Sequence, residues 1–191
     1  MAGMGDAFFF GYGSLVNRTT HGYDEAYRAR VTGWGRIWMQ TDLREAAYLT
    51  ATPAPGVEIE GLVAGVPGGD WAALDEREQG YLRHAIDGGG LVHEAGRPIA
   101  AQIYAVPHHR AVPGQARPIL LSYLDVVVQG YLREFGEQGA RGFFATTGGW
   151  DTPVLDDRAA PRYPRHRDLS RAERAFVDAE LAALGTTILR V

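Results

Sequence analysis

A chain of 191 residues, 46% of them hydrophobic, is long enough to fold around a core of its own. Its formal net charge of -4 gives no electrostatic reason to expect a nucleic acid or an anionic membrane as partner. The sequence contains neither cysteine nor lysine, so thiol nucleophiles, cysteine-bound metals and Schiff-base lysines are excluded. An enzyme built from this chain must use carboxylates, hydroxyls, histidines, arginines and backbone amides.

The sequence also bears on the compartment in which the protein works. No stretch approaches the roughly 18 consecutive apolar residues of a membrane span. Residues 1–6 lack the basic and apolar regions of a signal peptide, and without cysteine there is no disulfide framework that would suggest secretion. We therefore expect a cytoplasmic protein.

Strands are expected mainly in the first half of the chain. The apolar run Phe8-Phe9-Phe10 predicts a buried strand that ends in the glycine-containing turn after it. Gly, Pro or Asp residues bound the further strand candidates, which are residues 29–39, 46–52, 57–66, 81–86 and 99–106. After the Pro67-Gly68-Gly69 turn, Asp70 is a good N-cap for a short helix, and Gly80 is expected to close it in the left-handed conformation.

Longer helices are expected in the second half. One runs from about Pro118, which suits a first helical turn, to about Phe135. The last begins with the capping-box pattern of Ser170 and Glu173 and ends near Leu184. Between these helices, residues 148–167 predict a loop or ordered arm, and the arginines and acids of 156–174 are expected on a solvated, mixed-charge surface.

Strands followed by helices predict an α+β fold, with a curved or barrel-like mixed sheet and flanking helices. No linker or internal repeat divides the chain. We expect a single domain over residues 1–191, with a C-terminal loop and helix extension from about residue 148.

One acidic residue of the short helix is placed unusually. Trp71, Leu74 and Glu78 share one helix face, so the apolar pair draws Glu78 toward the core. Burial and the nearby C-terminal end of the helix both raise the pKa of a carboxyl, which suits a proton carrier near neutral pH. Asp75 and Glu76 lie off this face and are expected in solvent.

A second interpretation of Glu78 stays open. It could form a structural ion pair with Arg77 or Arg83, and such pairs also perturb pKa values.

The turn after the first strand contains two glycines and a serine. Gly11 and Gly13 would let successive backbone N–H groups converge on an anion such as a carboxylate, and Ser14 could add a hydroxyl donor. The turn is not a dinucleotide-binding fingerprint, because Val16 stands where that motif requires its third glycine. The alternative is a plain turn between strands.

Other candidates are less specific. Adjacent His108 and His109 point apart in most backbones, so we expect a surface loop there and not a metal site. Tyr123, on the helix from Pro118, could face a pocket or pack in the core. Trp150 could line a pocket or cap the core.

Two stretches suggest a family. Residues 10–15 read Phe-Gly-Tyr-Gly-Ser-Leu, and residues 74–81 read Leu-Asp-Glu-Arg-Glu-Gln-Gly-Tyr. Together they resemble the γ-glutamyl cyclotransferase superfamily, particularly its ChaC-like branch, which shows an F-G-Y-G-S-L turn and a Y-L-D-x-R-E-x-G-G-Y segment. The likeness covers roughly the first 90 residues. Only Gly80 stands where the branch has two glycines, and the C-terminal part does not closely match the glutathione-degrading members.

The resemblance implies a reaction and a set of site residues. A γ-glutamyl amide is cyclised to 5-oxoproline and its amine is released, with no cofactor and no metal. The only partner implied is this small-molecule substrate, and the oligomeric state is left open. By motif, the catalytic base is Glu78, and the turn holds the substrate. The candidate site residues are Glu78 for catalysis and, for substrate binding, Tyr12, Gly13, Ser14, Leu15, Tyr81 and Tyr123.

Two other functions stay open at this point. The same fold could serve as a non-catalytic binding or regulatory module for an amino-acid-like anion. An amide hydrolase would instead use water as the nucleophile. The leaving amine is also open: the peptide part of glutathione, a free amino acid and a polyamine all fit.

Overall fold

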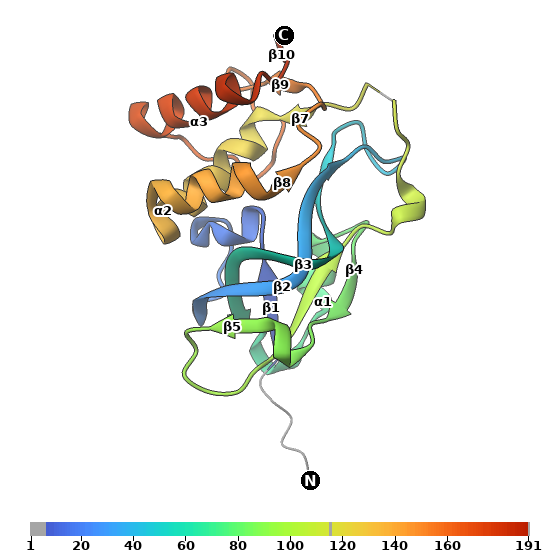
Figure 1. The fold of residues 1–191 in the computed structure, drawn as a ribbon, viewed down its shortest axis with the longest axis vertical. Helices are drawn as coiled ribbons and strands as arrows, with labels where there is room; N and C mark the ends of the chain where they lie inside the picture. Colours follow the sequence, from blue (N-terminus) through green and yellow to red (C-terminus); the bar gives the residue numbers. More distant parts are fainter. Residues whose placement is uncertain (1–6, 115, 191) are drawn as a thin grey trace.

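The computed structural model describes residues 7–114 and 116–190, so the expectation for residues 1–6 lies outside the described residues. Its larger sheet has seven strands in these ranges, and two long antiparallel strands form most of it (Figure 1). These are β2 (Ala26–Met39) and β3 (Tyr48–Gly65). The others are β1 (Ala7–Gly11), β4 (Leu82–Ala85), β5 (Leu91–His93), β6 (Ala100–Ala105) and β8 (Thr147–Gly148).

The strand order places β1 in the middle of the sheet. The order is β4-β6-β1-β3-β2-β5, with β8 paired to the far part of β2. β1 is antiparallel to β3 and parallel to β6. Phe8 and Phe10 pack in the main core and Phe9 in a second apolar cluster, because successive side chains of a strand point to opposite faces, so all three are fully buried, as the apolar run predicts.

The two strands predicted at residues 46–52 and 57–66 are one strand, and the predicted break between them is wrong. The pairing of β2 with β3 shifts register between Thr32 and Gly33, opposite Pro55 and Gly56. Gly33 and Gly56 both have positive φ, at 91° and 79°. A bulge therefore accommodates the proline-rich segment without ending the strand, and such bulges bend a sheet. The predicted α+β fold with a curved sheet is confirmed.

Three α-helices lie in the described chain: α1 (Ala72–Arg77), α2 (Leu121–Thr146) and α3 (Arg171–Leu184). α2 extends beyond the predicted end at Phe135. Gly136, with φ 67°, kinks the helix there, and a second segment continues with buried Phe143 and Phe144. The capping box of α3 is confirmed: Ser170 Oγ accepts from the Glu173 amide, and Glu173 accepts from the Ser170 amide.

The C-terminal part is more ordered than the predicted loop. β9 (Val154–Asp156) lies between β7 (Ile119–Leu120) and β10 (Ile188–Arg190) in a small parallel sheet at the top of Figure 1. Strands of two or three residues produce no readable periodicity, so the sequence does not reveal them.

The prediction of a solvated surface around residue 158 is also wrong in part. The Arg158 guanidinium binds the buried Asp125 carboxylate through two bonds of 2.7 Å and Asp178 through a third. A bidentate arginine–carboxylate pair of this kind fixes the chain after β9 against α2.

The main core lies between the sheet and α2, and it positions the first turn of the chain. Asn17 is buried and donates to the Val126 carbonyl and to Gln129 of α2. A Cβ at Gly130 would lie 2.7 Å from the Asn17 backbone nitrogen, so only glycine permits this close approach. The turn that follows β1 is thereby held against the helix.

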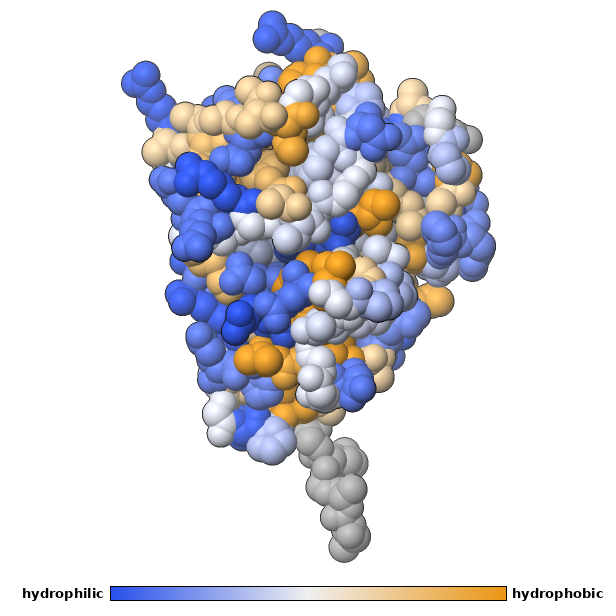
Figure 2. Space-filling model, in the orientation of Figure 1, coloured by the Kyte–Doolittle hydropathy of each residue, from blue (hydrophilic) through white to orange (hydrophobic). Residues whose placement is uncertain are grey.

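The face of the molecule in view is mixed in hydropathy. Figure 2 shows hydrophilic and hydrophobic residues interleaved over it, without one large apolar area. Among the helices of the described residues, none has the length and apolar character needed to cross a membrane.

Candidate active site

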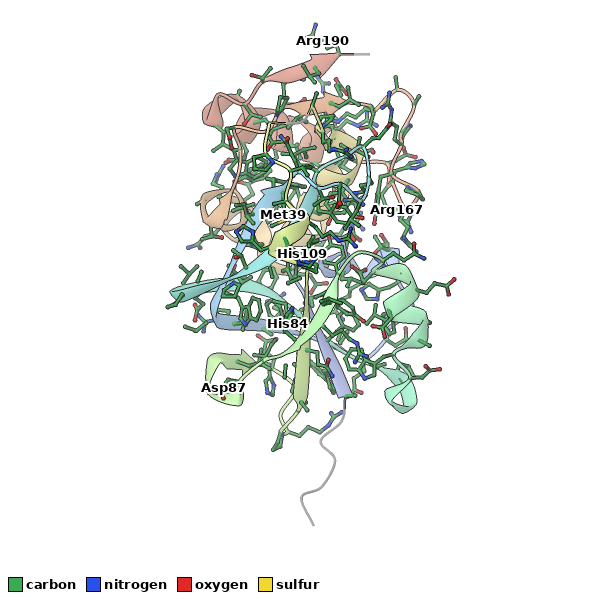
Figure 3. All side chains as sticks on the ribbon, turned by 90° about the vertical axis from the view of Figure 1, so that its right-hand side faces the viewer. Met39, His84, Asp87, His109, Arg167 and Arg190 are labelled. Atoms are coloured by element: carbon green, nitrogen blue, oxygen red, sulfur yellow. The ribbon has the colours of Figure 1, made fainter. Side chains whose placement is uncertain are left out.

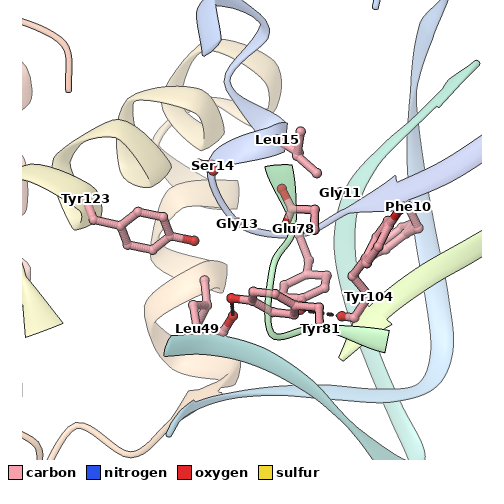
Figure 4. A pocket seen from close by; sticks show the side chains of 11 residues that line it. Phe10, Gly11, Gly13, Ser14, Leu15, Leu49, Glu78, Tyr81, Tyr104 and Tyr123 are labelled. Atoms are coloured by element: carbon pink, nitrogen blue, oxygen red, sulfur yellow. Dashed lines mark hydrogen bonds between the residues drawn. The ribbon is translucent and has the colours of Figure 1, made fainter. Parts of the chain in front are cut away.

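The end of β1, the turn after it and the end of α1 enclose a narrow pocket of about 310 Å³ including its open mouth (Figure 4). The structure brings all the candidate site residues together in its lining: Tyr12, Gly13, Ser14, Leu15, Glu78, Tyr81 and Tyr123. The remaining lining residues are Phe10, Gly11, Leu49 and Tyr104.

The two glycines of the turn are required because neighbouring side chains lie close to their Cα atoms, and not because the backbone is left-handed there. Neither Gly11 nor Gly13 has positive φ. A Cβ at Gly13 would lie 2.7 Å from the Tyr123 hydroxyl and 3.3 Å from Leu49 Cδ2, and one at Gly11 would lie 2.7 Å from Leu15 Cβ. Without these side chains the turn can form the pocket wall directly with its backbone.

Residues Ser14–Val16 form a 3₁₀ turn that lines the pocket. The amides of Ser14 and Leu15 begin this turn, so they have no acceptor within it, and the Ser14 amide interacts with the Tyr123 hydroxyl. Thr20 Oγ1 donates to the Ser14 carbonyl at 3.0 Å and holds the turn in place. Amides arranged in this way can bind a carboxylate or an oxyanion.

Glu78 lies one residue past the end of α1, which the sequence predicts as a longer helix. The Glu78 amide still donates to the Leu74 carbonyl, but its own φ and ψ of -94° and 39° are no longer helical. Gly80 has the expected left-handed φ, 92°, but it lies three residues after Arg77, the last residue of α1, and not next to the helix end. Asp70 Oδ1 accepts from the Ala72 amide, yet the residue at the N-cap is Trp71.

The Glu78 carboxylate is largely buried, with 16% of its side chain exposed, and points toward the turn (Figure 4). Burial raises its pKa, and the positive charge of Arg77 and, to a smaller extent, of Arg165 and Arg44 opposes this rise. Arg77 Nε lies 3.3 Å from Glu78 Oε1. The two interpretations of Glu78 thus both apply, because it is ion-paired and still has a raised pKa.

Arg83, the other partner considered for Glu78, binds Asp75 instead. Its Nε lies 2.9 Å from Asp75 Oδ1, which also accepts from the Tyr104 hydroxyl at 2.6 Å. Asp75 is exposed, as expected, but it also joins β4 and β6 to α1.

The hydroxyl groups of the pocket tyrosines differ in their hydrogen-bond partners. Tyr12 donates to the Tyr104 carbonyl at 2.6 Å, and Tyr81 donates to the Leu49 carbonyl at 2.7 Å. The Tyr123 hydroxyl donates no hydrogen bond within the described residues and lies over Gly13. Burial raises the pKa of Tyr12, Tyr81 and Tyr123. These phenols are neutral near pH 7. Among the described residues that line the pocket, Glu78 is the only one with a carboxyl group.

Sequence reasoning did not identify two of the lining residues. Leu49 of β3 and Tyr104 of β6 reach the pocket through strand pairing and hydrogen bonding, and neither stands in a motif. The sequence allows Trp150 to line a pocket or to cap the core. In the structure it packs on the core and stacks on Phe144.

The histidines do not form a metal site in the part of the chain that the structure covers. His108 and His109 lie in a short 3₁₀ turn, and His84 lies on β4; Figure 3 labels His109 and His84 on these separate segments. No group of three or more His, Asp or Glu side chains in residues 7–114 and 116–190 could hold a metal ion.

Solved structures with the same fold include one named gamma-glutamyl cyclotransferase, with a TM-score of 0.57, 14% identity and coverage of 90% of this chain and 98% of that one. An uncharacterized protein of Homo sapiens, loc79017, has a TM-score of 0.56 and 16% identity, and the match covers 90% of this chain and 97% of that one. YkqA from Bacillus subtilis has a TM-score of 0.54 and 17% identity, and the match covers 75% of this chain and 56% of YkqA. At such identities the likeness shows the fold alone.

No curated protein matches this chain. Residues 9–124, however, match the family model described as gamma-glutamyl cyclotransferase, AIG2-like. The matched range is more than half of the chain and includes both the turn after β1 and Glu78. This protein belongs to the AIG2-like γ-glutamyl cyclotransferase family.

Proposed function

We propose that this protein is a γ-glutamyl cyclotransferase, which converts a γ-glutamyl amide to 5-oxoproline and a free amine, with Glu78 as the catalytic base. One observation supports the proposal most directly. A carboxylate whose pKa is raised by burial faces a turn of backbone amides across a narrow pocket. A base, an anion-binding wall and a neutral hydroxyl are the groups that this reaction needs.

The substrate contains its own nucleophile, so the enzyme needs to supply little more than orientation and proton transfer. Glu78 takes a proton from the α-ammonium group, and the free amine attacks the γ-carbonyl carbon. A C–N bond forms and the carbonyl oxygen becomes an oxyanion. The new ring nitrogen carries a positive charge at this stage. Protonated Glu78 gives its proton to the leaving nitrogen, the oxyanion collapses and the bond to that nitrogen breaks. The Glu78 carboxylate then takes the extra proton from the ring nitrogen and passes it to the released amine, which departs as an ammonium ion. Holding the reacting atoms together can supply about 7–11 kcal/mol.

The Leu15 amide and the Ser14 hydroxyl are assigned to the α-carboxylate of the substrate. This wall of the pocket offers donors and no carboxylate, so it complements a negative charge. Tyr123 is assigned to the developing oxyanion, because its hydroxyl has no other acceptor among the described residues. Tyr12 and Tyr81 shape the pocket with their rings, since their hydroxyls donate to backbone carbonyls.

Some finer assignments are part of the proposal as well. The reaction as written uses no metal and no cofactor. The ChaC-like branch is favoured only by the two sequence stretches, at residues 10–15 and 74–81. The organisation as one domain with a C-terminal extension from about residue 148 is supported by the small sheet, in which β9 and β10 pair beside β7.

The experiment that tests the proposal is detection of 5-oxoproline by mass spectrometry after incubation with a panel of γ-glutamyl compounds. Glu78→Gln keeps the shape of the side chain and removes the base, so we expect turnover to fall by about 10²–10⁴-fold. Glu45→Gln is the control, with an exposed carboxylate that lines neither the pocket nor the hollow beside α1, and should keep full activity. Undiminished turnover in Glu78→Gln would contradict the assignment.

An analogue without the α-amine separates the other functions. A cyclotransferase cannot process it, whereas an amide hydrolase would release glutarate from it. A binding module would be thermally stabilised by substrate and would form no product.

A further inference from the structure

A segment beyond the family-matched residues lies against the pocket. Residues 157–168, called the strap here, are anchored at their start by buried Asp157. Its carboxylate accepts from the amide and the hydroxyl of Ser122, at 2.8 and 2.6 Å, and from the Arg162 amide at 2.8 Å. Because Ser122 directly precedes Tyr123, this anchor connects the strap to the pocket wall.

Two further contacts fix the strap over the site. The Tyr163 ring packs edge-on against the Tyr123 ring, with centroids 4.9 Å apart. Near the end of the strap, Arg167 donates to the carbonyl oxygen and hydroxyl of Thr19, at 2.5 and 3.2 Å. Figure 3 shows Arg167 above α1. The strap therefore runs from the Tyr123 side of the pocket to the α1 side.

Between these contacts, Arg165 lines a surface hollow of about 620 Å³, mostly open to solvent, together with Ala73, Glu76, Arg77 and Gln79. Of these residues, Arg77 contacts the catalytic carboxylate, with its Nε 3.3 Å from Glu78 Oε1. The positive charge of Arg165 also acts on Glu78, whose pKa it lowers. The Arg165 guanidinium forms no hydrogen bond and no ion pair with any described residue, so it is free to bind a ligand.

The other cations near Glu78 already have partners. Arg77 binds Glu78 and Thr20. Arg44 donates to the Ala47 carbonyl and lies over the Tyr48 ring, 3.5 Å from its centroid. Three arginines thus surround Glu78, and Glu76 is the only carboxylate that lines the hollow. A positive leaving group would be repelled here and a negative one attracted.

The proposed reaction places the leaving nitrogen beside Glu78, because Glu78 returns the proton to it. If the leaving amine is an amino acid, its carboxyl carbon lies about 2.5 Å from that nitrogen, across two bonds. In a dipeptide the carboxylate is about one residue, roughly 3.5 Å, farther away. A carboxylate at either position lies close to Glu78, and Arg77, which contacts Glu78, shares its hollow with Arg165.

We propose that Arg165 binds the carboxylate of the leaving group, so that the substrates are γ-glutamyl amino acids or peptides and not γ-glutamyl amines. This inference rests on the proposed cyclotransferase function. It assigns the strap, which lies outside the family-matched range, as the part of the chain that selects the leaving group.

The test compares three substrates that differ in the charge of the leaving group: γ-glutamyl-alanine, γ-glutamyl-alaninamide and γ-glutamyl-putrescine. The variants are Arg165→Gln and, as matched control, Arg162→Gln, which removes the same charge from an exposed side chain of the same strap. Formation of 5-oxoproline is followed for each pair, and thermal unfolding establishes that both variants are folded.

We expect the unmodified protein to prefer γ-glutamyl-alanine over the alaninamide by at least about 10-fold in kcat/KM, since charge-assisted hydrogen bonds are the strong ones. Arg165→Gln should lose about 10-fold on γ-glutamyl-alanine, mainly through KM, and nothing on the alaninamide. Arg162→Gln should match the unmodified protein. Added salt should raise KM for γ-glutamyl-alanine in the unmodified protein more than in Arg165→Gln.

Equal activity on all three substrates would overturn the role of Arg165 and leave the cyclotransferase function intact. A loss in Arg165→Gln of the same size on the charged and the neutral substrate would also overturn it, since the effect would then not depend on the carboxylate. If no γ-glutamyl compound of the wider panel forms 5-oxoproline, the proposed function itself fails, and this inference with it.

Discussion

The guanidinium of Arg77 connects the Glu78 carboxylate to the loop that follows the pocket turn. Its Nε lies 3.3 Å from Glu78 Oε1, and its terminal nitrogens donate to the carbonyl oxygen and hydroxyl of Thr20, at 2.8 and 3.1 Å. Thr20 in turn donates to the Ser14 carbonyl. The base and the amide-bearing turn are therefore held by one continuous set of hydrogen bonds, so Arg77 affects both charge and geometry.

This relationship predicts a shift in pH dependence for Arg77→Gln. Burial raises the pKa of Glu78 and Arg77 lowers it, so removing the arginine leaves the rise less opposed. Because the base must be deprotonated, the acidic limb of the profile of kcat/KM against pH should move to higher pH. The direction follows from the sign of the charge removed, since a neighbouring positive charge favours the deprotonated form of a carboxyl group.

Arg83→Gln is the control for this shift, because Arg83 binds Asp75 and not Glu78. Its acidic limb should coincide with that of the unmodified protein. An unchanged limb in folded Arg77→Gln would mean that Arg77 does not set the proton affinity of Glu78.

Tyr123→Phe should reduce kcat more than Tyr81→Phe. The Tyr123 hydroxyl donates to no described residue and is free for the oxyanion, while the Tyr81 hydroxyl donates to the Leu49 carbonyl. Removing an oxyanion donor typically costs about 10²–10³-fold in kcat. Tyr81→Phe should instead lower the free energy of unfolding, by about 1–3 kcal/mol, because it leaves a buried carbonyl without a donor.

Steady-state kinetics and thermal unfolding of the two variants separate these roles. The assignment of Tyr123 fails if its phenylalanine variant keeps kcat within about twofold of the unmodified protein, far short of the loss of an oxyanion donor.

Gly13→Ala should close the pocket while leaving the fold in place. The added methyl would lie 2.7 Å from the Tyr123 hydroxyl and 3.3 Å from Leu49 Cδ2, so Tyr123 must move away from the turn. We expect kcat/KM to fall by at least about 10-fold, because small misplacements of reacting groups cost about two orders of magnitude. Gly22→Ala is the control, since a Cβ there would meet no atom within 4 Å. Normal kinetics in Gly13→Ala would show that the close approach is not needed.

The placements that the sequence predicted correctly share a local signal. Glu78, which lies in the pocket, follows two apolar residues at helical spacing, the turn carries two glycines separated by one residue, and Ser170 with Glu173 forms a capping box within one helical turn. In each case a few neighbouring residues determine the outcome, so a pattern in the chain is sufficient.

The residues that it missed depend on contacts between distant segments. Leu49 and Tyr104 reach the pocket only because β3 and β6 lie on opposite sides of β1. The proline-rich middle of β3 favours a break, and only pairing with β2 across a bulge keeps the strand continuous. Asp157 and Arg158 look like surface charges until Ser122 and Asp125 of α2 are placed beside them. Tertiary contacts of this kind override local propensity.

Asp157→Asn should loosen the strap and destabilise the protein. The carboxylate is 2% exposed and accepts three hydrogen bonds, two from Ser122 and one from Arg162. An asparagine amide replaces one acceptor oxygen with a donor, which leaves a buried N–H facing another donor. Loss of hydrogen bonds to a charged group should cost about 2–3 kcal/mol. For a protein of this size that corresponds to a fall in Tm of roughly 4–12 °C, at about 2–4 °C per kcal/mol.

Thermal unfolding and limited proteolysis measure this effect. In Asp157→Asn, cleavage within residues 157–168 should become faster than in the unmodified protein, because local opening of the strap exposes its backbone. Asp168→Asn is the matched control at the other end of the strap, where the exposed side chain makes no hydrogen bond or ion pair with a described residue, and its Tm should not change. Equal Tm values for the two variants would mean that Asp157 does not anchor the strap. If Asp157→Asn also reduces activity on γ-glutamyl-alanine more than on the alaninamide, the strap acts on the leaving group through Arg165, because a general loss of fold would reduce both equally.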